Sequence, residues 1–171
     1  VHRDEIAVCV AALLLGRPIK WVEDRAEALI AGGHSRTEAL EMELAIDANA
    51  TITAARYSWE DTCGAFALTP PEGSAMLGSM FCTGPYRIPR VGVSVKAWFT
   101  NTANNVAYRD HGAGETLIRE ATMDVAARQI GMDPVDFRLH NMIRAEDQPY
   151  TLASQIPVDG ISPVETTQQA A

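Results

Sequence analysis

The stretch "TEALEMELAIDANATITAARY", residues 37–57, decides the class of fold. In its first half apolar residues alternate with acidic or small ones, the period-two pattern of a half-buried strand. The apolar positions are Leu40, Met42, Leu44 and Ile46. Residues 47–50 supply turn chemistry and residues 51–57 predict a partner strand, so the two strands form a hairpin. A third alternating segment at 91–99 predicts another long strand.

Helical patterns precede this hairpin. Residues 4–15 are almost continuously apolar and predict a largely buried helix. Residues 17–24, which open with a proline at the second position, predict a short strand. Residues 24–33 predict a short helix that Asp24 caps and two glycines end.

Helical patterns also follow the strands, so the fold class is α+β, with mixed helices and antiparallel hairpin strands. Residues 115–130 predict a helix, and its apolar face is expected at Leu117, Ala121 and Val125. A capping aspartate and a first-turn proline start another helix at 133–143, and residues 145–161 read as polar loop.

Composition narrows the functional classes. Of the 171 residues, 47% are hydrophobic and 21% are charged, which supports a packed core. The net charge is −8, from 14 basic and 22 acidic residues, and an acidic surface repels the phosphates of nucleic acids. No apolar run approaches the roughly 18 residues of a membrane span.

The cysteines and the chain ends add two expectations. Cys9, Cys63 and Cys82 are odd in number and far apart, which disfavours a disulfide framework and suits the reducing cytoplasm. Buried spectator thiols are preferred over a metal site, because no ligand spacing joins them to histidines. The chain opens just before an apolar helix, and the capping box at 162–165 announces a helix that stops at Ala171. We therefore expect residues 1–171 to be a partial domain, truncated at both ends.

The least ordinary stretch is the turn at residues 104–114, called here the candidate loop. It places Tyr108, Arg109, Asp110 and His111 beside glycines, between a strand and a helix. The plainer interpretation is a solvated surface connection. The alternative is a ligand site, because a turn that enters a helix exposes backbone N–H groups to anionic or oxo-bearing ligands.

A family resemblance favours the ligand site. The stretch "TNTANNVAYRDHGAGETLIREATMDVAARQIGMDPVDFRLHNMI", residues 100–143, resembles the molybdenum-cofactor subunit of the molybdenum hydroxylases. This family includes xanthine dehydrogenase, aldehyde oxidase and the large subunit of aerobic carbon monoxide dehydrogenase. "LGRPIKWVEDR" at 15–25 and "YRIPRVGVSVKAWFTN" at 86–101 are similar to further segments of the family. The resemblance implies part of the aldehyde oxidase/xanthine dehydrogenase molybdopterin-binding domain.

The resemblance also implies the site. Ala107, Tyr108 and Arg109 are expected to bind the molybdenum–pterin cofactor, with the main chain of Arg109 near the molybdenum. Asp110 and His111 are expected to line the substrate pocket. No catalytic residue is expected within this chain, because the general base of the family would lie beyond Ala171.

The implied activity is hydroxylation of aldehydes or N-heterocycles with water as the oxygen source. Iron–sulfur clusters and FAD are expected on partner subunits or domains of a homo- or hetero-oligomer, and this chain alone is expected to be inactive. Copper-containing carbon monoxide dehydrogenases of the family carry a cysteine where this sequence has Asp110, which disfavours carbon monoxide oxidation. The alternative is a catalytically inactive accessory or interaction domain that retains the fold.

Overall fold

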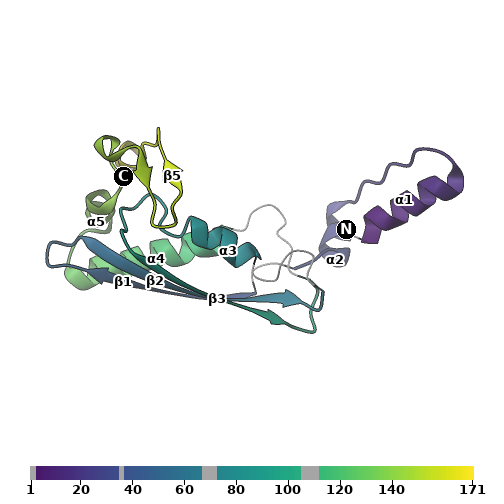
Figure 1. The fold of residues 1–171 in the computed structure, drawn as a ribbon, viewed down its shortest axis with the longest axis horizontal. Coiled ribbons are helices and arrows are strands. Elements are labelled where there is room, and N and C mark those ends of the chain that lie inside the picture. Colours follow the sequence, from purple (N-terminus) through teal and green to yellow (C-terminus); the bar gives the residue numbers. More distant parts are fainter. Residues whose placement is uncertain (1–2, 35–36, 67–72, 105–111) are drawn as a thin grey trace.

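A computed structural model describes residues 3–34, 37–66, 73–104 and 112–171 (Figure 1). In chain order its elements are α1 (Arg3–Leu15), α2 (Arg25–Ala31), β1 (Glu38–Ile46), β2 (Ile52–Gly64), α3 (Gly73–Met80), β3 (Val91–Phe99), α4 (Ala113–Ile130), α5 (Pro134–Asn141), the 3₁₀ helix η1 (Ala145–Asp147), β4 (Tyr150–Thr151), β5 (Pro157–Val158) and α6 (Pro163–Ala170). The mixture of helices and a sheet confirms the predicted α+β class.

The main sheet has the strand order β1-β2-β3. β1 and β2 form the predicted antiparallel hairpin, in register from Glu38 opposite Asp61 to Ala45 opposite Ala54, with a register shift before Ile46 pairs with Ile52. β2 runs on to Gly64, seven residues beyond the strand predicted from the sequence. β3 pairs parallel to β2, with Val91 opposite Ala55. Parallel neighbours need a crossover connection, and the segment that contains α3 supplies it.

α4 packs against β1 and closes the core on one face of the sheet (Figure 1). The core cluster joins buried side chains from β2, from the segment that follows α3, from α4, and from α5 and the residue after it. Its buried members are Ile52, Ala55, Tyr57, Cys82, Tyr86, Ile88, Met123, Ala126, Ala127, Phe137 and Met142. Met42 and Leu44 of β1 pack against it half-buried, as their alternation predicts.

The predicted buried face of α4 is wrong, although the helix itself is confirmed. Leu117 is 71% exposed and Val125 47% exposed, and Ala121 is exposed as well. The buried positions are instead Glu115, Arg119, Met123, Ala126 and Ala127. Two of these are charged and neutralise each other by pairing, so a search for apolar periodicity could not select this face.

The segment before the sheet departs from expectation in two ways. α1 is a helix as predicted, but its outer side chains are exposed rather than buried. The strand predicted at 17–24 is absent from the described structure of that segment, which has no neighbouring strand to pair with. α2 is confirmed with a full capping box between Asp24 and Glu27. Figure 1 shows α1 and α2 as an arm that extends from one end of the sheet.

The C-terminal part confirms one cap and corrects another. Asp133 accepts hydrogen bonds from the first-turn amides of α5, as predicted. α6 begins at Pro163, but the side chain of Ser162 makes no capping hydrogen bond. The region predicted as loop contains η1 and the short antiparallel ribbon of β4 and β5. No helix within the described ranges is long and apolar enough to cross a membrane.

Candidate functional site

The predicted site residues Ala107, Tyr108, Arg109, Asp110 and His111 lie outside the described residues. The structure describes the chain on both sides of them, where the candidate loop leaves β3 and where it enters α4. These two flanking segments are the supports of the candidate loop.

The upstream support is a stem that ties the end of β3 to the end of β2. The amide of Thr100 donates to the carbonyl of Gly64 at 3.1 Å, which continues the pairing past the last strand residue. The hydroxyls of Thr100 and Thr102 lie 2.8 Å apart. The amide of His34 donates to the carbonyl of Asn104 at 3.0 Å, so a third segment holds the end of the stem.

Gly64 makes this stem possible. Its φ is +70°, in the left-handed region that favours glycine. A Cβ there would stand 2.2 Å from the carbonyl oxygen of Ala103 and 2.6 Å from the Cα of Asn104. Only a residue without a side chain lets the two backbones approach so closely. Beside this contact Nδ2 of Asn104 is buried and has no hydrogen-bond partner among the residues that the structure describes.

The downstream support is the first turn of α4. Its N-cap Gly112 has no side chain with which to cap the helix. A Cβ on Gly114 would stand 2.6 Å from Oε2 of Glu38 and 3.0 Å from Cδ1 of Leu40, so this turn lies directly against the start of β1. The backbone N–H groups that open α4 are therefore held next to the sheet, at the place where the candidate loop ends.

A buried ion-pair network anchors the same turn to the rest of the core. Arg119 pairs with Glu115 one turn earlier, and both side chains are less than 10% exposed. Nε of Arg119 also lies 3.0 Å from Glu120, whose other oxygen accepts from Arg138 of α5 and from the hydroxyl of Tyr86, each at 2.9 Å. These bonds fix the rotation of α4 and thereby the position at which the candidate loop joins it.

Within this network the carboxyl group of Glu120 has a lowered pKa, whereas the nearby Tyr86 and Cys82 have raised ones. Burial alone would raise the pKa of Glu120, but hydrogen bonds from Arg138, Tyr86 and Arg119 lower it overall, so the carboxylate stays ionised. Burial raises the pKa of Tyr86 well above its ordinary value. Burial also raises the pKa of Cys82 to about 11, which keeps this thiol protonated at neutral pH.

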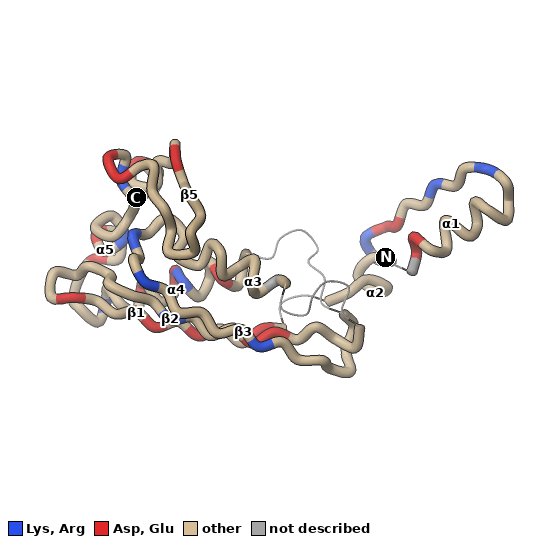
Figure 2. The backbone as a smooth tube through the Cα atoms, viewed as in Figure 1, with Lys and Arg blue, Asp and Glu red and all other residues tan. Residues whose placement is uncertain are grey.

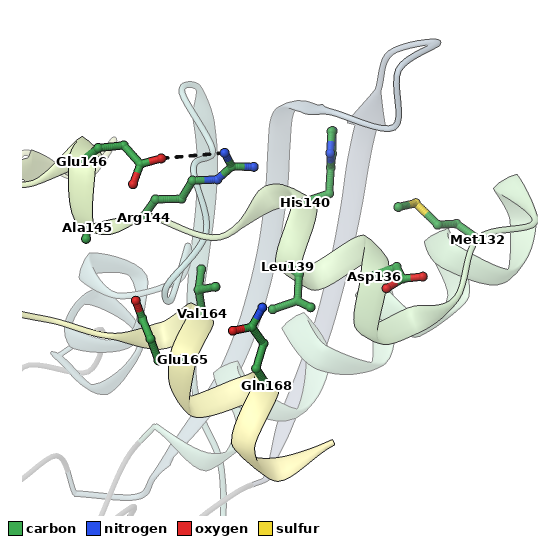
Figure 3. A pocket seen from close by; sticks show the side chains of 10 residues that line it. All are labelled: Met132, Asp136, Leu139, His140, Arg144, Ala145, Glu146, Val164, Glu165 and Gln168. Carbon is green, nitrogen blue, oxygen red and sulfur yellow. Dashed lines mark ion pairs between the residues drawn. The ribbon is translucent and has the colours of Figure 1, made fainter.

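A separate hollow of about 520 Å³ lies between α5, η1 and α6 (Figure 3). It is lined by Met132, Asp136, Leu139, His140, Arg144, Ala145, Glu146, Val164, Glu165 and Gln168. Nε2 of His140 lies 3.1 Å from the hydroxyl of Thr51, at the hairpin-turn end of β2. Gly64 is at the other end of this 13-residue strand, roughly 40 Å away at the usual rise per residue. The hollow is therefore distinct from the candidate loop.

The described part of the chain was searched for groups of side chains that could hold a metal ion and for free thiols. Within the described ranges no group of three or more His, Cys, Asp or Glu side chains is placed to hold a metal ion. Cys9, Cys63 and Cys82 are free thiols, of which the first is exposed and the other two are buried. The described part of the site thus offers the backbone N–H groups that open α4, the buried side-chain amide of Asn104 and the close backbone approaches at Gly64 and Gly114.

The model of the molybdopterin cofactor-binding domain family matches residues 1–142, and the chain belongs to this family. It is 36% identical over 154 residues to the 6-hydroxypseudooxynicotine dehydrogenase complex subunit gamma of Paenarthrobacter nicotinovorans, an alignment that covers 88% of this chain and 19% of the relative. It is 37% identical over 156 residues to the carbon monoxide dehydrogenase large chain of Hydrogenophaga pseudoflava, with the same two shares.

Among solved structures, quinoline 2-oxidoreductase from Pseudomonas putida 86 superposes with a TM-score of 0.86 at 29% sequence identity. The superposition covers 99% of this chain and 22% of that one. The chain thus spans about a fifth of the length of the relatives that it matches.

The described residues fit a pterin cofactor. Such a cofactor carries ring carbonyl and phosphate oxygens, which accept hydrogen bonds from N–H donors. Nδ2 of Asn104, which has no hydrogen-bond partner among the described residues, and the backbone N–H groups that open α4 are donors of this kind, at the two ends of the candidate loop. The contact at Gly64 keeps side-chain bulk away from the stem.

Sequence reasoning singled out the loop but missed its supports. Gly64 was not predicted to have a role, Asn104 was included only as the first residue of the candidate loop, and the pairing of Glu115 with Arg119 was not predicted. A glycine that ends a long alternating strand is a signal of close backbone approach and was available in the sequence. The buried pair gave a weaker signal, the four-residue spacing of opposite charges that is equally common on exposed helix faces.

Proposed function

We propose that residues 1–171 are part of the molybdopterin-binding subunit of an oxidoreductase that hydroxylates aldehydes or N-heterocycles with water as the oxygen source. The observation that carries this proposal is the rigid pair of supports around the candidate loop, in a chain of the molybdopterin cofactor-binding domain family. A loop that must hold a cofactor precisely needs both of its ends fixed.

Within this proposal Ala107, Tyr108 and Arg109 bind the cofactor, and the main chain of Arg109 approaches the molybdenum. Asp110 and His111 border the substrate. When bound, the cofactor supplies the two-electron oxidation of the substrate carbon. The protein chain orients it through the backbone and excludes bulk from its surroundings, and the general base comes from outside residues 1–171.

We infer the substrate class from the names of the relatives and from Asp110, at which this sequence differs from the copper-containing carbon monoxide dehydrogenases. Relatives are named for nicotine 6-hydroxylation and quinoline oxidation, and others are named aldehyde oxidoreductase or carbon monoxide dehydrogenase. Asp110 stands where the copper-containing carbon monoxide dehydrogenases have a cysteine. A carboxylate does not replace a thiolate as a ligand for copper(I), so we infer an organic substrate.

The proposed partners are subunits or domains that carry iron–sulfur clusters and FAD. The names of relatives, complex subunit gamma and large subunit, support an assembly of several chains. Electrons taken from the substrate must leave the site, and the described part of this chain has no metal-ligand cluster to receive them. We place the complex in the cytoplasm, since the cysteines of this chain are free.

The test uses the full-length subunit with its partners. Molybdenum content after gel filtration and dye reduction with aldehydes and N-heterocycles are measured together. We expect one molybdenum per subunit and turnover with at least one substrate of these classes. Molybdenum-free protein that is folded and inactive would instead support the accessory domain.

The loop itself is tested with three variants at equal molybdenum content. His111→Ala should lower kcat or raise KM, because the side chain borders the substrate. Asp110→Gly should retain or improve activity, since it removes a carboxylate from the metal's surroundings. Arg144→Ala, in the separate hollow of Figure 3, is the control and should match the parent. Three variants equal to the parent would place the loop on an ordinary surface.

A further inference from the structure

Three buried polar side-chain atoms have no hydrogen-bond partner among the residues that the structure describes. They are Nε1 of Trp59, Oγ1 of Thr83 and Nδ2 of Asn104. A buried polar atom without a partner destabilises the folded state, so native proteins keep few of them. The place of each atom in the fold indicates what offsets this loss.

Trp59 and Thr83 belong to the packed interior, where each residue is 2% exposed. The ring of Trp59 lies so close to α3 that a Cβ on Gly78 would stand 2.4 Å from it. Thr83 lies in the turn after α3, next to the glycine that contacts the guanidinium of Arg119. Close packing of the apolar atoms offsets one missing hydrogen bond at these two positions.

Asn104 differs from these two residues because it is only half-buried and lies at the end of the stem. Its backbone is held on two sides. The amide of His34 donates to its carbonyl at 3.0 Å, and a Cβ on Gly64 would stand 2.6 Å from its Cα. Part of the residue is accessible, so a turn of the amide about its own side-chain bond presents Nδ2 to a ligand. The fixed backbone thus preorganises this donor.

The stem contributes no charged side chain of its own. Residues 62–66 and 97–104 contain no lysine, arginine, aspartate or glutamate, and Figure 2 draws this end of the sheet in the colour of uncharged residues. A phosphate dianion held here would lack a balancing cation from the stem, whereas a neutral ring carbonyl or ring nitrogen needs only an N–H donor. The stem is therefore suited to a neutral acceptor.

We propose that the side-chain amide of Asn104 binds the cofactor, with Nδ2 donating a hydrogen bond to a ring oxygen or ring nitrogen of the pterin. The inference rests on the proposed function, in which this chain holds that cofactor, and it adds a residue upstream of the predicted Ala107, Tyr108 and Arg109. Asn104 is three residues before Ala107 and six before Asp110, so it is nearer in the chain to the expected cofactor contacts than to the expected substrate contacts. Binding of the cofactor gives the buried donor the partner that it lacks among the described residues.

Two replacements of similar size separate cofactor binding from folding. Asn104→Asp keeps the shape and replaces the N–H donor by an acceptor, and Asn104→Leu removes the polarity. Both are made in the full-length subunit with its partners, once loaded with cofactor and once from cells that make no molybdenum cofactor. Pterin fluorescence and molybdenum content measure how fast the cofactor dissociates, and thermal unfolding measures the stability of each form.

We expect the cofactor to dissociate from both variants roughly three- to tenfold faster than from the parent, as the loss of one hydrogen bond predicts. Cofactor-free Asn104→Leu should unfold at the temperature of the parent or above it, because the replacement removes a buried donor without a described partner. Bound cofactor should therefore raise the unfolding temperature of the variant less than that of the parent. Should Asn104→Leu fail to fold, Asn104→Asp still reports on dissociation.

Thr83→Val is the matched control. It also removes a buried polar atom that has no partner among the described residues, but in the turn after α3 instead of at the stem. Asn49→Ala, at the exposed hairpin turn beyond the other end of β2, controls for the loss of an asparagine. The cofactor should dissociate from both controls at the rate of the parent.

Three results would overturn the proposal. In the first, the cofactor leaves the parent and both Asn104 variants at the same rate, which leaves the proposed function standing. In the second, dissociation is unchanged but the KM for the substrate rises, which would assign the amide to the substrate. In the third, the parent complex holds no pterin, and the proposed function fails together with this inference.

Discussion

At the scale of single residues, Gly64 combines two constraints that can be measured separately. Gly64→Ala introduces a Cβ both into the left-handed region and into the carbonyl of Ala103. Gly160→Ala meets the first constraint at a φ of +66°, but no atom lies within 4 Å of its Cβ. We expect about 1–2 kcal/mol of destabilisation from conformation at both positions. Overpacking should add about 1–3 kcal/mol at Gly64 alone.

Urea denaturation of both variants measures this difference. Equal losses of unfolding free energy would contradict the close approach of the two backbones at the stem.

The buried pair of Arg119 and Glu115 gives a second residue-scale prediction. Arg119→Met leaves Glu115 buried without its partner, and we expect a loss of about 3–5 kcal/mol of unfolding free energy. Arg56→Met removes an ion pair with Glu43 of similar chemistry on the exposed surface, and should cost less than about 1 kcal/mol. Chemical denaturation of the two variants checks the contrast. A loss below 1 kcal/mol for Arg119→Met would mean that the network does not anchor α4.

Glu120 predicts how stability depends on pH. Its folded-state pKa is depressed below the ordinary value of 4.5. The stabilisation is therefore fully present above that value and is lost as the pH falls through the folded-state pKa. We expect the unfolding free energy to fall more steeply between about pH 5 and pH 3 in the parent than in Glu120→Gln. Identical pH slopes in urea titrations of the two proteins would contradict this assignment.

Some residue roles could be read from the sequence and others could not. Asp24 and Asp133 were predicted as caps because capping depends only on residues two or three positions away. The roles of Gly64 and Arg119 depend on segments 38 or more residues distant, such as the carbonyls of Ala103 and Phe81. Local spacing contains no information about such contacts.

At the scale of elements, α4 shows which side of a helix the core selects. Leu117 is exposed and Met123 is fully buried, opposite to the order that apolar periodicity predicts. Leu117→Ala should therefore change the unfolding free energy of residues 1–171 by less than about 0.5 kcal/mol. Met123→Ala should cost about 2–5 kcal/mol. Denaturation midpoints decide between the two faces, and a larger loss at Leu117 than at Met123 would restore the predicted one.

The strands were predictable to different extents for physical reasons. Alternation located β1 and β2 because each has one face toward the core. It also located β3, although Val93 and Phe99 of this strand are exposed and only Val91 packs against the core. The parallel pairing of β3 was not predicted, since side-chain alternation is the same in either direction. The strand predicted at 17–24 failed because an extended apolar segment becomes a strand only when a neighbour supplies hydrogen bonds.

At the scale of the whole molecule, the described structure has two separate ends with different chemistry. One end of the sheet holds the stem, the start of α4 and the arm of α1 and α2, and the other holds α5, α6 and the hollow between them (Figure 1). The α+β class and the strand and helix on either side of the candidate loop were predicted from the sequence. The burial of α1 was not confirmed, because burial depends on what surrounds a helix and not on its composition alone.

The proposed function requires that the full-length complex takes the oxygen of its product from water. The full-length complex is supplied with an N-heterocycle or an aldehyde and an electron-accepting dye in water enriched in ¹⁸O. The expected reaction replaces a C–H bond by C–OH, releases two protons and passes two electrons to the dye. Mass spectrometry should find ¹⁸O in the product, in proportion to the enrichment of the water. Product labelled from O₂ instead, or no hydroxylated product from a molybdenum-replete complex, would contradict the account.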